Sequence, residues 1–510
     1  DDVFQQGTAI VSLTWVKGNH TYKFGGELRN QGDYRLDFSA INGTYAFGTQ
    51  QTALPYIVAG NAAATVGGQP IGFPYASFLL GLVNNGNVKP GSAARIGKHQ
   101  LGFYAQDTWK ITRKITLDYG LRYDYSTYFK EQYGRMAAFS PTIANATAGG
   151  HPGGVIYESN CNCNFAKNYP WAFGPRLGLA WQLAPKTVLR AGFGIAYTGT
   201  AQYNLAGGVV SATNPFGPSA DPGREVMTLG GGLPLTTQQI AWPNFSANYF
   251  PVVSSPGQIV GTGPTAVVDQ NAGRPGRQYQ WSIGIQRQLT KDFLVEASYV
   301  GNRQNWLIAT NMLNYNFVSN DILKANGLSL SNPADLAILN ATITSAAAGR
   351  FQNKLPFTGF TGTVAQSLRP FPQFNGGLAP LWSPLGKAWY DSLQAKVTKR
   401  FSQGLDFTYA FTWAKELDNF SSGSFDVQNR PLFKSLSSNS RPFVNGLGFN
   451  YRLQAWGKNK IMSLAVRDWE LGGFMQYASA LPIAAPAATT TPALGNVVFQ
   501  NTVQNRVAGQ

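Results

Sequence analysis

Charged and amide side chains that could bind a polar solute recur at every second position in several segments of the chain. Successive side chains of a β-strand point to opposite faces, so residues with this spacing share one face. There they could line a path for a polar solute through hydrogen bonds and charge, without covalent chemistry. Equally, they could form an ordinary hydrated wall that is satisfied by water and cross-strand pairs. The candidates are Asp118, Arg122, Arg176, Arg190, Gln280, Gln286, Glu296, Lys396 and Asp406.

Residue types that catalyse reactions show no comparable grouping. The three histidines, His20, His99 and His151, fall in a predicted turn, at a strand start and in a loop. No nucleophile–histidine–acid set, no carboxylate pair in a plausible cleft and no phosphate-binding glycine motif stands out. Glu158 with residues 160–164 suggests a cation site in a loop, but nothing in the sequence fixes its geometry. We therefore predict no enzymatic activity, no cofactor and no metal, with a protease or lipase as the alternative.

Cys161 and Cys163 are the two cysteines of the chain, and Asn162 separates them. Such a pair could form a strained disulfide in an oxidising compartment, or it could supply two thiolates to a metal. No further cysteine or histidine cluster completes a metal site. The sequence therefore favours a loop disulfide or two thiols without a role.

The strand pattern is clearest in residues 393–415. Apolar residues occupy most odd positions, polar residues occupy many even positions, and Ser402, Gln403 and Gly404 lie between the two halves. A period of two on both sides of a short turn predicts a β-hairpin with one apolar and one polar face. In a sandwich the apolar face would cover a core. The many aromatic residues on that face, opposite so polar a face, favour a barrel with lipid outside and water inside.

Six hairpins of this kind are predicted, and each strand is close to the roughly ten residues that cross a bilayer at a tilt. They pair residues 9–16 with 21–29, 100–111 with 115–124, 176–183 with 187–197, 279–289 with 293–300, the two halves of 393–415, and 443–453 with 469–481. Two weaker strands are predicted at 36–47 and after Asn84, for a total of about fourteen.

Short turns alternate with long connections. The segments at 125–172, 198–277, 302–388 and 416–442 are long and rich in Gly, Pro, Asn and Ser. Repeated connections of this length count against a compact domain in water. Short turns at one rim and long loops at the other are typical of outer-membrane barrels. The predicted fold is therefore all-β, an antiparallel transmembrane β-barrel.

Two short helices are predicted within these connections. Asn332 and Pro333 favour a helix start, which predicts a helix over 334–348, and residues 75–82 predict another. The partial barrel is expected to occupy residues 1–482, followed by an irregular tail over 483–510 that is rich in Ala, Thr and Pro.

Composition agrees with this class and argues against nucleic acid. Charged residues make up 13% of the chain, about half the usual fraction of roughly 25%. The net charge of +16 comes from 40 basic and 24 acidic residues. Many of the basic residues flank the short turns, where they would lie beside lipid head groups. Nucleic-acid recognition signatures are absent, so we predict membrane lipid and not nucleic acid as a partner.

Aromatic residues fall near both ends of the predicted apolar faces. This is the arrangement of two interfacial girdles, in which an amphipathic ring lies between hydrocarbon and head groups. The alternative is the aromatic core of a sandwich. The predicted girdle residues are Trp15, Trp109, Tyr123, Trp181, Tyr197, Trp281, Tyr299, Trp413 and Trp469.

Several motifs in a consistent order resemble the barrel of TonB-dependent outer-membrane receptors, and more narrowly their Oar-like branch, which is abundant in Acidobacteria. They are FYAQDTWK at 103–110, LDYGLRY at 117–123, FGPRLGLAW at 173–181, TVLRAGFG at 187–194, IQRQ at 285–288, ASYVG at 297–301, RPFPQF at 369–374, VTKRF at 397–401 and FTWAK at 411–415. Each motif alone is weak, whereas the ordered set covers nearly the whole chain.

The resemblance implies a barrel of about twenty-two strands closed by an N-terminal plug, in the bacterial outer membrane. It implies energised uptake or binding of a large solute, such as an oligosaccharide, a peptide or a siderophore-like molecule, with the TonB complex as partner. This chain is expected to lack the plug, the TonB-contacting segment and the final strands, and to be an internal piece of a longer barrel. A surface adhesion barrel and a passive porin are the alternatives.

Overall fold

The computed structural model describes most of the chain. The described residues are 2–37, 43–53, 65–66, 69–88, 92–132, 134, 136–145, 148–158, 164–199, 214–216, 223–231, 267–309, 312–374, 376–420, 427, 429–453 and 469–483. The predicted tail over 483–510 therefore lies almost wholly outside them.

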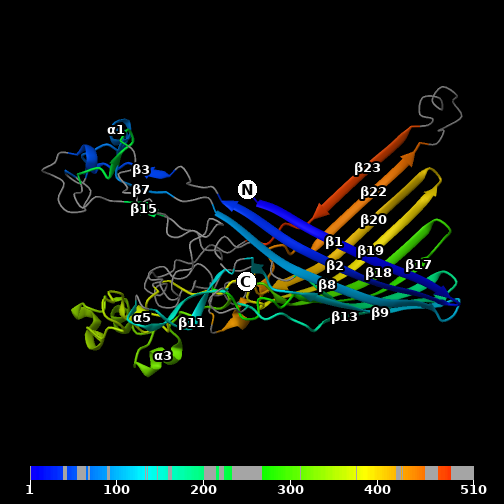
Figure 1. Ribbon diagram of the computed structural model, residues 1–510. Helices are drawn as coiled ribbons and strands as arrows, with labels where there is room; N and C mark the ends of the chain where they lie inside the picture. The colour runs from blue at the N-terminus through cyan, green and yellow to red at the C-terminus, as the bar shows by residue number, and fades with distance from the viewer. Residues whose placement is uncertain are drawn as a thin grey trace.

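One large antiparallel sheet dominates the protein (Figure 1). Twelve long strands follow one another in chain order across it. They are β1 (Asp2–Lys17), β2 (His20–Asp37), β8 (Ser92–Lys110), β9 (Ile115–Ser126), β13 (Ala172–Ala184), β14 (Thr187–Tyr197), β17 (Arg277–Gln288), β18 (Phe293–Leu307), β19 (Gly386–Ser402), β20 (Leu405–Asp418), β22 (Phe443–Arg452) and β23 (Glu470–Ala478). Two short strands complete the fourteen: β10 (Lys130–Glu131) pairs with β8, and β21 (Ser435–Leu436) pairs with β20.

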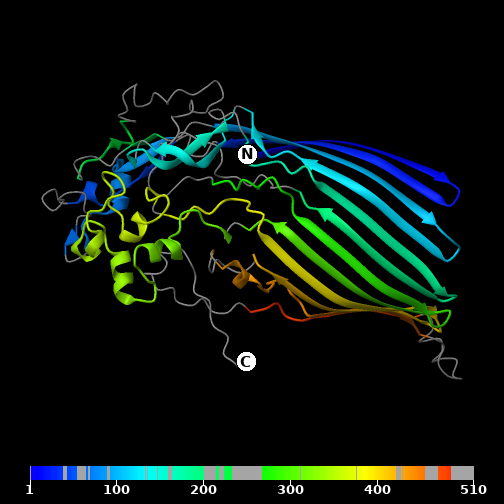
Figure 2. The same cartoon turned by 90° about the horizontal axis from the view of Figure 1, so that it is seen from below.

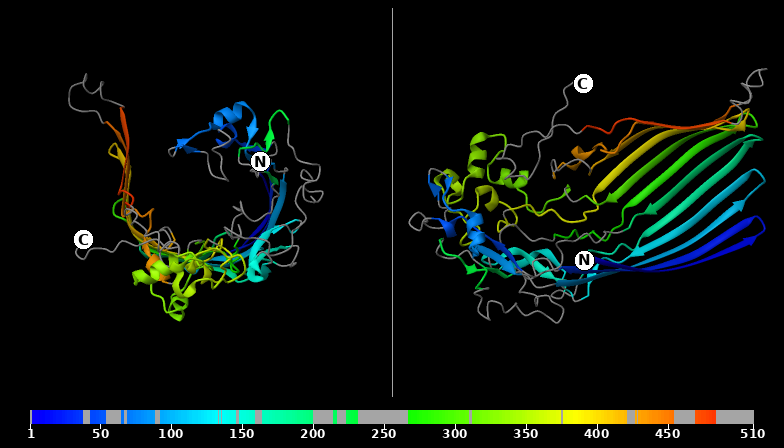
Figure 3. Two further views of the ribbon diagram at one scale, coloured as in Figure 1. Left: turned by 90° about the vertical axis from the view of Figure 1, so that its left-hand side faces the viewer. Right: turned by 90° about the horizontal axis from the view of Figure 1, so that it is seen from above.

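The sheet curves into an open arc, with β1 and β23 at its two edges (Figure 3). Each edge strand pairs with one neighbour in the described part of the sheet. In a second view the long strands lie side by side at a tilt, and the helices lie beyond one end of them (Figure 2). The shape is that of a barrel wall.

The short turns follow from their sequences. Gly18 and Asn19 connect β1 to β2, and Gly18 has a positive φ of 59°. Gln403 and Gly404 connect β19 to β20, with φ values of 53° and 81°. Positive φ at the centre of a two-residue turn matches the twist of the flanking strands, which is why Gly and small polar residues suit such turns. These turns lie at the same end of the sheet (Figure 1).

The long connections lie at the opposite end, and the segment between β2 and β8 is a further one. The sequence predicted two barrel strands here, at 36–47 and after Asn84, and this was wrong. Instead, β3 (Thr44–Ala46) and β7 (Asn85–Val88) pair with each other and with β15 (Asn214–Phe216) in a separate small sheet. The predicted total of fourteen strands is nevertheless met, because β10 and β21 join the large sheet.

The long connections contain further short elements. The remaining strands are β4 (Thr65–Val66), β5 (Gln69–Pro70), β6 (Leu82–Val83), β11 (Ala137–Asn145), β12 (His151–Tyr157) and β16 (Met227–Thr228). The helices are η1 (Gln50–Thr52), α1 (Pro74–Leu79), α3 (Asn320–Ala325), α4 (Pro333–Asn340), η4 (Ala346–Phe351), α5 (Val364–Ser367) and η5 (Arg430–Phe433).

Both predicted helices exist, in altered form. The helix expected over 75–82 is α1, and it ends at Leu79. The helix expected over 334–348 ends at Asn340, and the 3-10 helix η4 follows it. The side chain of Asn332 accepts a hydrogen bond from the backbone N–H of Ala334, as its capping role requires.

Most of the buried apolar residues lie in the loops rather than in the large sheet. Leu323, Leu339 and Val364 are almost fully buried where α3, α4, η4 and α5 pack together. On the sheet, by contrast, Val11 is 73% exposed and Ile283 is 52% exposed. An extended apolar surface of this kind requires a partner medium. None of the described helices is both long and apolar enough to span a membrane.

Candidate functional site: the polar face of the sheet

The strand register places all nine predicted solute-binding residues on one face of the sheet. Asp118 and Arg122 alternate with apolar residues along β9, and Arg122 lies opposite Gly174 of β13. Along β13, Arg176 lies two residues after Gly174 and therefore points to the same side of the sheet. The register of the remaining strands gives the same face to the other six residues. We call this face, which also carries Glu27 and Gln106, the polar face.

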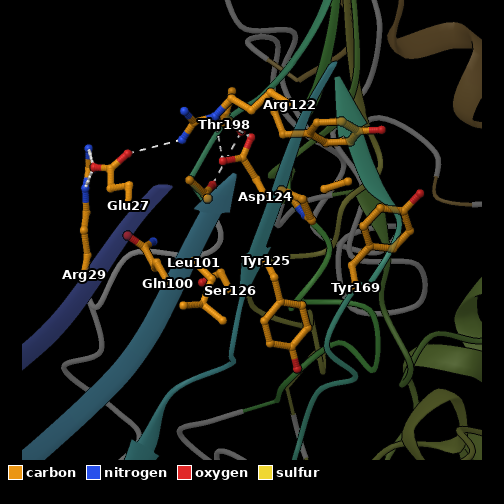
Figure 4. Close-up of a pocket in the computed structure, with 15 residues that line it drawn as sticks. Glu27, Arg29, Gln100, Leu101, Arg122, Asp124, Tyr125, Ser126, Tyr169 and Thr198 are labelled. Atoms are coloured by element: carbon orange, nitrogen blue, oxygen red, sulfur yellow. Dashed lines mark hydrogen bonds and ion pairs between the residues drawn. The ribbon is translucent and has the colours of Figure 1, made fainter. Parts of the chain in front are cut away.

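Arg122 is the centre of a charge network on the polar face (Figure 4). Its Nη2 atom lies 3.2 Å from Oε2 of Glu27 on β2. Its Nε atom donates to both carboxylate oxygens of Asp124, at 2.8 and 3.0 Å. Glu27 also forms an ion pair with Arg29. The network therefore joins β2 to β9 across the intervening strand β8.

A cavity of about 210 Å³ opens beside this network. Glu27, Arg29, Arg122 and Asp124 line it together with Gln100 of β8. Tyr169 and Thr198 reach it from the connections at the strand ends remote from the short turns (Figure 4). A hollow that presents two carboxylates, two guanidinium groups and an amide can hydrogen-bond a polar solute of either charge.

The other predicted residues of the polar face form pairs further round the arc. Gln286 donates from Nε2 to Oε1 of Glu296 at 3.2 Å. Glu296 in turn lies directly opposite Lys396 of β19. Near the far edge, Asn450 donates to Asp406 at 3.4 Å. These are separate local pairs, so the structure does not gather the nine residues into one cluster.

Arg176, Arg190, Gln280 and Asp118 occupy more open positions. Arg190 lies opposite Gly284, and Gln280 lies opposite Gly194. Asp118 accepts a hydrogen bond of 2.6 Å from the hydroxyl of Thr108. Glycine opposite a long polar side chain leaves it room to extend into the space in front of the sheet.

Sequence reasoning missed Glu27 and Asp124, which hold Arg122 in place, and Arg29, which pairs with Glu27. Asp124 lies two residues after Arg122 in one predicted strand and therefore on the same face, and this spacing could have identified it. The partnership with Glu27 could not be found in this way, because it depends on the register between β2 and β8 and between β8 and β9.

The apolar face carries one polar cluster near the short turns. His20 and Asp107 approach to 2.6 Å between Nδ1 and Oδ2, and the hydroxyl of Tyr119 donates to the same oxygen at 3.0 Å. The ring of His20 stacks on that of Trp109, with centroids 5.3 Å apart. No local pattern indicates that His20 meets a carboxylate, because Asp107 lies 87 residues away in the chain. The cluster ties β2, β8 and β9 together at this rim.

The predicted girdle residues lie on the face opposite the charge network. Trp15 stacks on Tyr22, and Tyr123 packs against Phe173 with centroids 4.8 Å apart. Trp413 is 55% exposed and Trp469 is 65% exposed. Trp109, Trp181, Tyr197, Trp281 and Tyr299 share this face by register. Exposed rings at both ends of an apolar face are the pattern of an interfacial belt.

The two cysteines, and residues 160–163 of the predicted loop cation site, lie outside the described residues. Glu158 itself is buried, and its Oε2 accepts a hydrogen bond of 3.1 Å from the backbone N–H of Glu131. Burial raises the pKa of Glu158 to about 7, and the charge of Glu131 acts in the same direction. Within the described part of the chain, no group of three or more His, Cys, Asp or Glu residues could hold a metal ion.

Long antiparallel strands with one apolar and one polar face, joined by short turns at one end only, define the class of membrane-spanning β-barrels. The model of the family described as "Outer membrane beta barrel domain" matches residues 3–510, and the chain belongs to this family. It is a protein of the bacterial outer membrane. No curated protein matches the chain in sequence.

Solved structures with a similar arrangement share little sequence with the chain. The copper transporter OprC is 11% identical, with a TM-score of 0.40 over 93% of this chain and 43% of that one. The ferric-catecholate import receptor Fiu from E. coli K12 is 14% identical, with a TM-score of 0.40 over 96% and 46%. The outer membrane transporter YddB from Escherichia coli is 10% identical, with a TM-score of 0.42 over 94% and 47%. The chain thus spans less than half the length of each.

Proposed function

We propose that this chain is the barrel portion of a TonB-dependent receptor of the outer membrane that binds and takes up a large polar solute. The observation that carries the proposal is the Arg122 network beside a cavity on the polar face, near the long connections. In an outer-membrane barrel that face borders the aqueous interior, and the long loops face the cell exterior. A solute that enters between the loops therefore meets these charges early.

The ordered sequence motifs support the TonB-dependent class and, more narrowly, the Oar-like branch. TonB would supply the energy for uptake, and the solute could be an oligosaccharide, a peptide or a siderophore-like molecule. Recognition uses hydrogen bonds and charge only, so we propose no enzymatic activity and no cofactor. The other named pairs, such as Gln286 with Glu296, would extend the polar path along the wall.

Uptake by intact cells tests the proposal. Cells with and without the gene are grown in a mixture of oligosaccharides, peptides and metal chelates, and depletion of each solute from the medium is followed by mass spectrometry. We expect at least one solute to be depleted only when the gene is present and only while the membrane is energised. Arg122→Gln should slow that depletion at least tenfold, whereas Arg113→Gln, at an exposed short turn, should not.

The alternatives give different results in the same cells. A passive porin predicts depletion that continues after a protonophore has removed the energy source. A surface adhesion barrel predicts no gene-dependent depletion, together with loss of attachment when residues 302–388 are shortened. Either outcome, in cells with normal amounts of the protein in the outer membrane, contradicts energised uptake.

A further inference from the structure

Three arginines lie among aromatic rings at the strand ends remote from the short turns. Arg277 and Arg303 are on the apolar face by register, and Arg274 lies in the connection that precedes β17. Arg277 opens β17, Arg274 precedes it by three residues, and Arg303 lies near the end of β18. The rings around them are those of Tyr169, Tyr197, Tyr279, Trp281 and Trp306. We call these eight residues the basic–aromatic belt.

Two guanidinium groups of the belt contact the same indole ring. The Cζ atom of Arg277 lies 4.0 Å from the centroid of the Trp306 ring, and that of Arg274 lies 4.7 Å from it. Arg277 also lies 5.0 Å from the ring of Tyr279. Contacts between cations and aromatic faces hold the charges in position without neutralising them.

The backbone is distorted to present this ring. Trp306 has a φ of 64°, in the left-handed region that non-glycine residues seldom adopt. It lies at a register shift between Asn305 and Leu307, where β18 pairs with β19. A bulge re-aims a side chain, and strain retained at such a position points to a role for that side chain.

Within the described part of the chain, the charges of Arg274 and Arg277 are not balanced by acids. Arg303 forms an ion pair with Asp391, at 2.8 Å between Nη2 and Oδ2. Among the residues that the structure describes, no ion pair involves Arg274 or Arg277, and the buried Nε atom of Arg277 has no hydrogen-bond partner. Two neighbouring positive charges that no acid balances form a site for an anion, and guanidinium groups suit the oxygens of a phosphate.

The position of the belt indicates where this anion comes from. Arg277 lies opposite Tyr197, the last residue of β14, and β14 has 11 residues counted from the short turn. Roughly ten residues of a tilted strand cross the hydrocarbon of a bilayer. The belt therefore lies at head-group level on the side of the long connections. Its strand residues Arg277, Tyr279, Trp281 and Arg303 turn toward lipid, whereas Tyr169 and Tyr197 also border the cavity.

We infer that Arg274 and Arg277 bind a phosphate group of an anionic lipid in the outer leaflet. The guanidinium groups donate to the phosphate oxygens, while the rings of Tyr197, Tyr279 and Trp281 lie against the less polar part of the same lipid. The inference rests on the outer-membrane location of the chain and not on the proposed uptake function. It predicts that the protein keeps one such lipid after extraction from the membrane.

Native mass spectrometry of the full chain in detergent tests the inference. The probes are a phosphorylated glycolipid, the same glycolipid after enzymatic removal of its phosphates, and inorganic phosphate alone. We expect binding of the phosphorylated lipid to exceed that of the dephosphorylated lipid at least tenfold. Equal binding of the two lipids overturns the inference, and so does displacement of the lipid by inorganic phosphate at equal concentration, which would indicate a site for free anions.

Variants locate the site. The double variant Arg274→Gln, Arg277→Gln should reduce binding of the phosphorylated lipid at least tenfold. Lys324→Gln, on α3, removes one positive charge at an exposed position outside the belt and should leave binding unchanged. Heat-dependent migration on a denaturing gel shows whether each variant is folded. Should the double variant not fold, Arg277→Lys provides the test, because it keeps the charge but loses the two-pronged donor geometry and should bind several-fold less. Retention of full binding by folded variants contradicts the assignment.

Discussion

The indole ring of Trp281 on β17 lies over the backbone of Gly301, its direct partner on β18. A Cβ atom added at Gly301 would approach to 2.4 Å of Cε2 in the ring. No real Cβ contact is so short, so any side chain at Gly301 must displace the ring. The glycine thus provides the surface on which a girdle tryptophan rests, and both residues face the lipid side.

Gly301→Ala should therefore destabilise the barrel wall by about 1–3 kcal/mol, the usual effect of forcing extra atoms into a packed contact. Urea unfolding in lipid vesicles, followed by tryptophan fluorescence, measures the change. Gly446→Ala is the matched control, because a Cβ there meets nothing within 4 Å. Equal effects of the two substitutions would mean that the ring does not rest on Gly301 in the membrane.

The lipid-facing side of the sheet can be tested at two adjacent residues of β17. Ile283 belongs to the apolar face and Ser282 to the polar face, and the side chains of both are exposed. Ile283→Arg should cost about 2–4 kcal/mol in vesicle folding assays, because its charge enters hydrocarbon near the middle of the strand. Ser282→Arg adds the same side chain toward water and should change stability by less than about 1 kcal/mol. A reversed order of the two effects would show that the faces are assigned wrongly.

The sequence predicted the barrel wall well because a period of two over long segments specifies both the strands and their faces. Residues 393–415 became β19 and β20 with the expected turn at Gln403 and Gly404. The segment between β2 and β8 was misread because it is apolar without a clear period, and such runs are ambiguous. Its strands β3 and β7 pair in a small separate sheet with β15 instead, whereas α1 lies where a helix was predicted.

The candidate site was only half predictable for a similar reason. Alternation assigns Arg122 to the polar face, but the contact with Glu27 depends on two successive strand registers. The belt on the other face depends on the bulge at Trp306, which redirects one side chain. No local pattern in the sequence around Trp306 encodes that redirection. Contacts between distant segments therefore needed the folded chain.

The buried carboxyl group of Glu158 predicts a pH-dependent loop. Burial raises its pKa from the ordinary 4.5 to about 7. A folded-state pKa above the unfolded one means that the proton-linked stability is complete below pH 4.5 and is lost as the pH rises through 7. Hydrogen exchange of residues 128–158, corrected for its intrinsic pH dependence, should show more frequent opening at pH 8 than at pH 5.

Glu158→Gln should remove this difference, which amounts to at most about 3 kcal/mol for a shift of this size. Asp321→Asn, at an exposed position in the first turn of α3, serves as the control and should behave like the unaltered protein. If protection of the loop is the same at both pH values, Glu158 is not buried in its acid form.

Gln373 joins two of the long connections and offers a test of their mutual packing. Its Nε2 atom donates to the backbone carbonyls of Pro152 and Gly153, at 2.9 and 2.8 Å, although more than 200 residues separate them in the chain. Beside it, the ring of Phe371 packs against that of Phe139, with centroids 4.9 Å apart.

Gln373→Leu removes both hydrogen bonds, each contributing about 0.5–1.5 kcal/mol. Limited proteolysis of intact cells should then cut the loops several-fold faster, while the sheet stays folded. Gln352→Leu, an exposed position in the same connection, should leave the cutting rate unchanged. Unaltered cutting of Gln373→Leu would mean that the two connections move independently, because the hydrogen bonds that join them could then be lost without exposing either one.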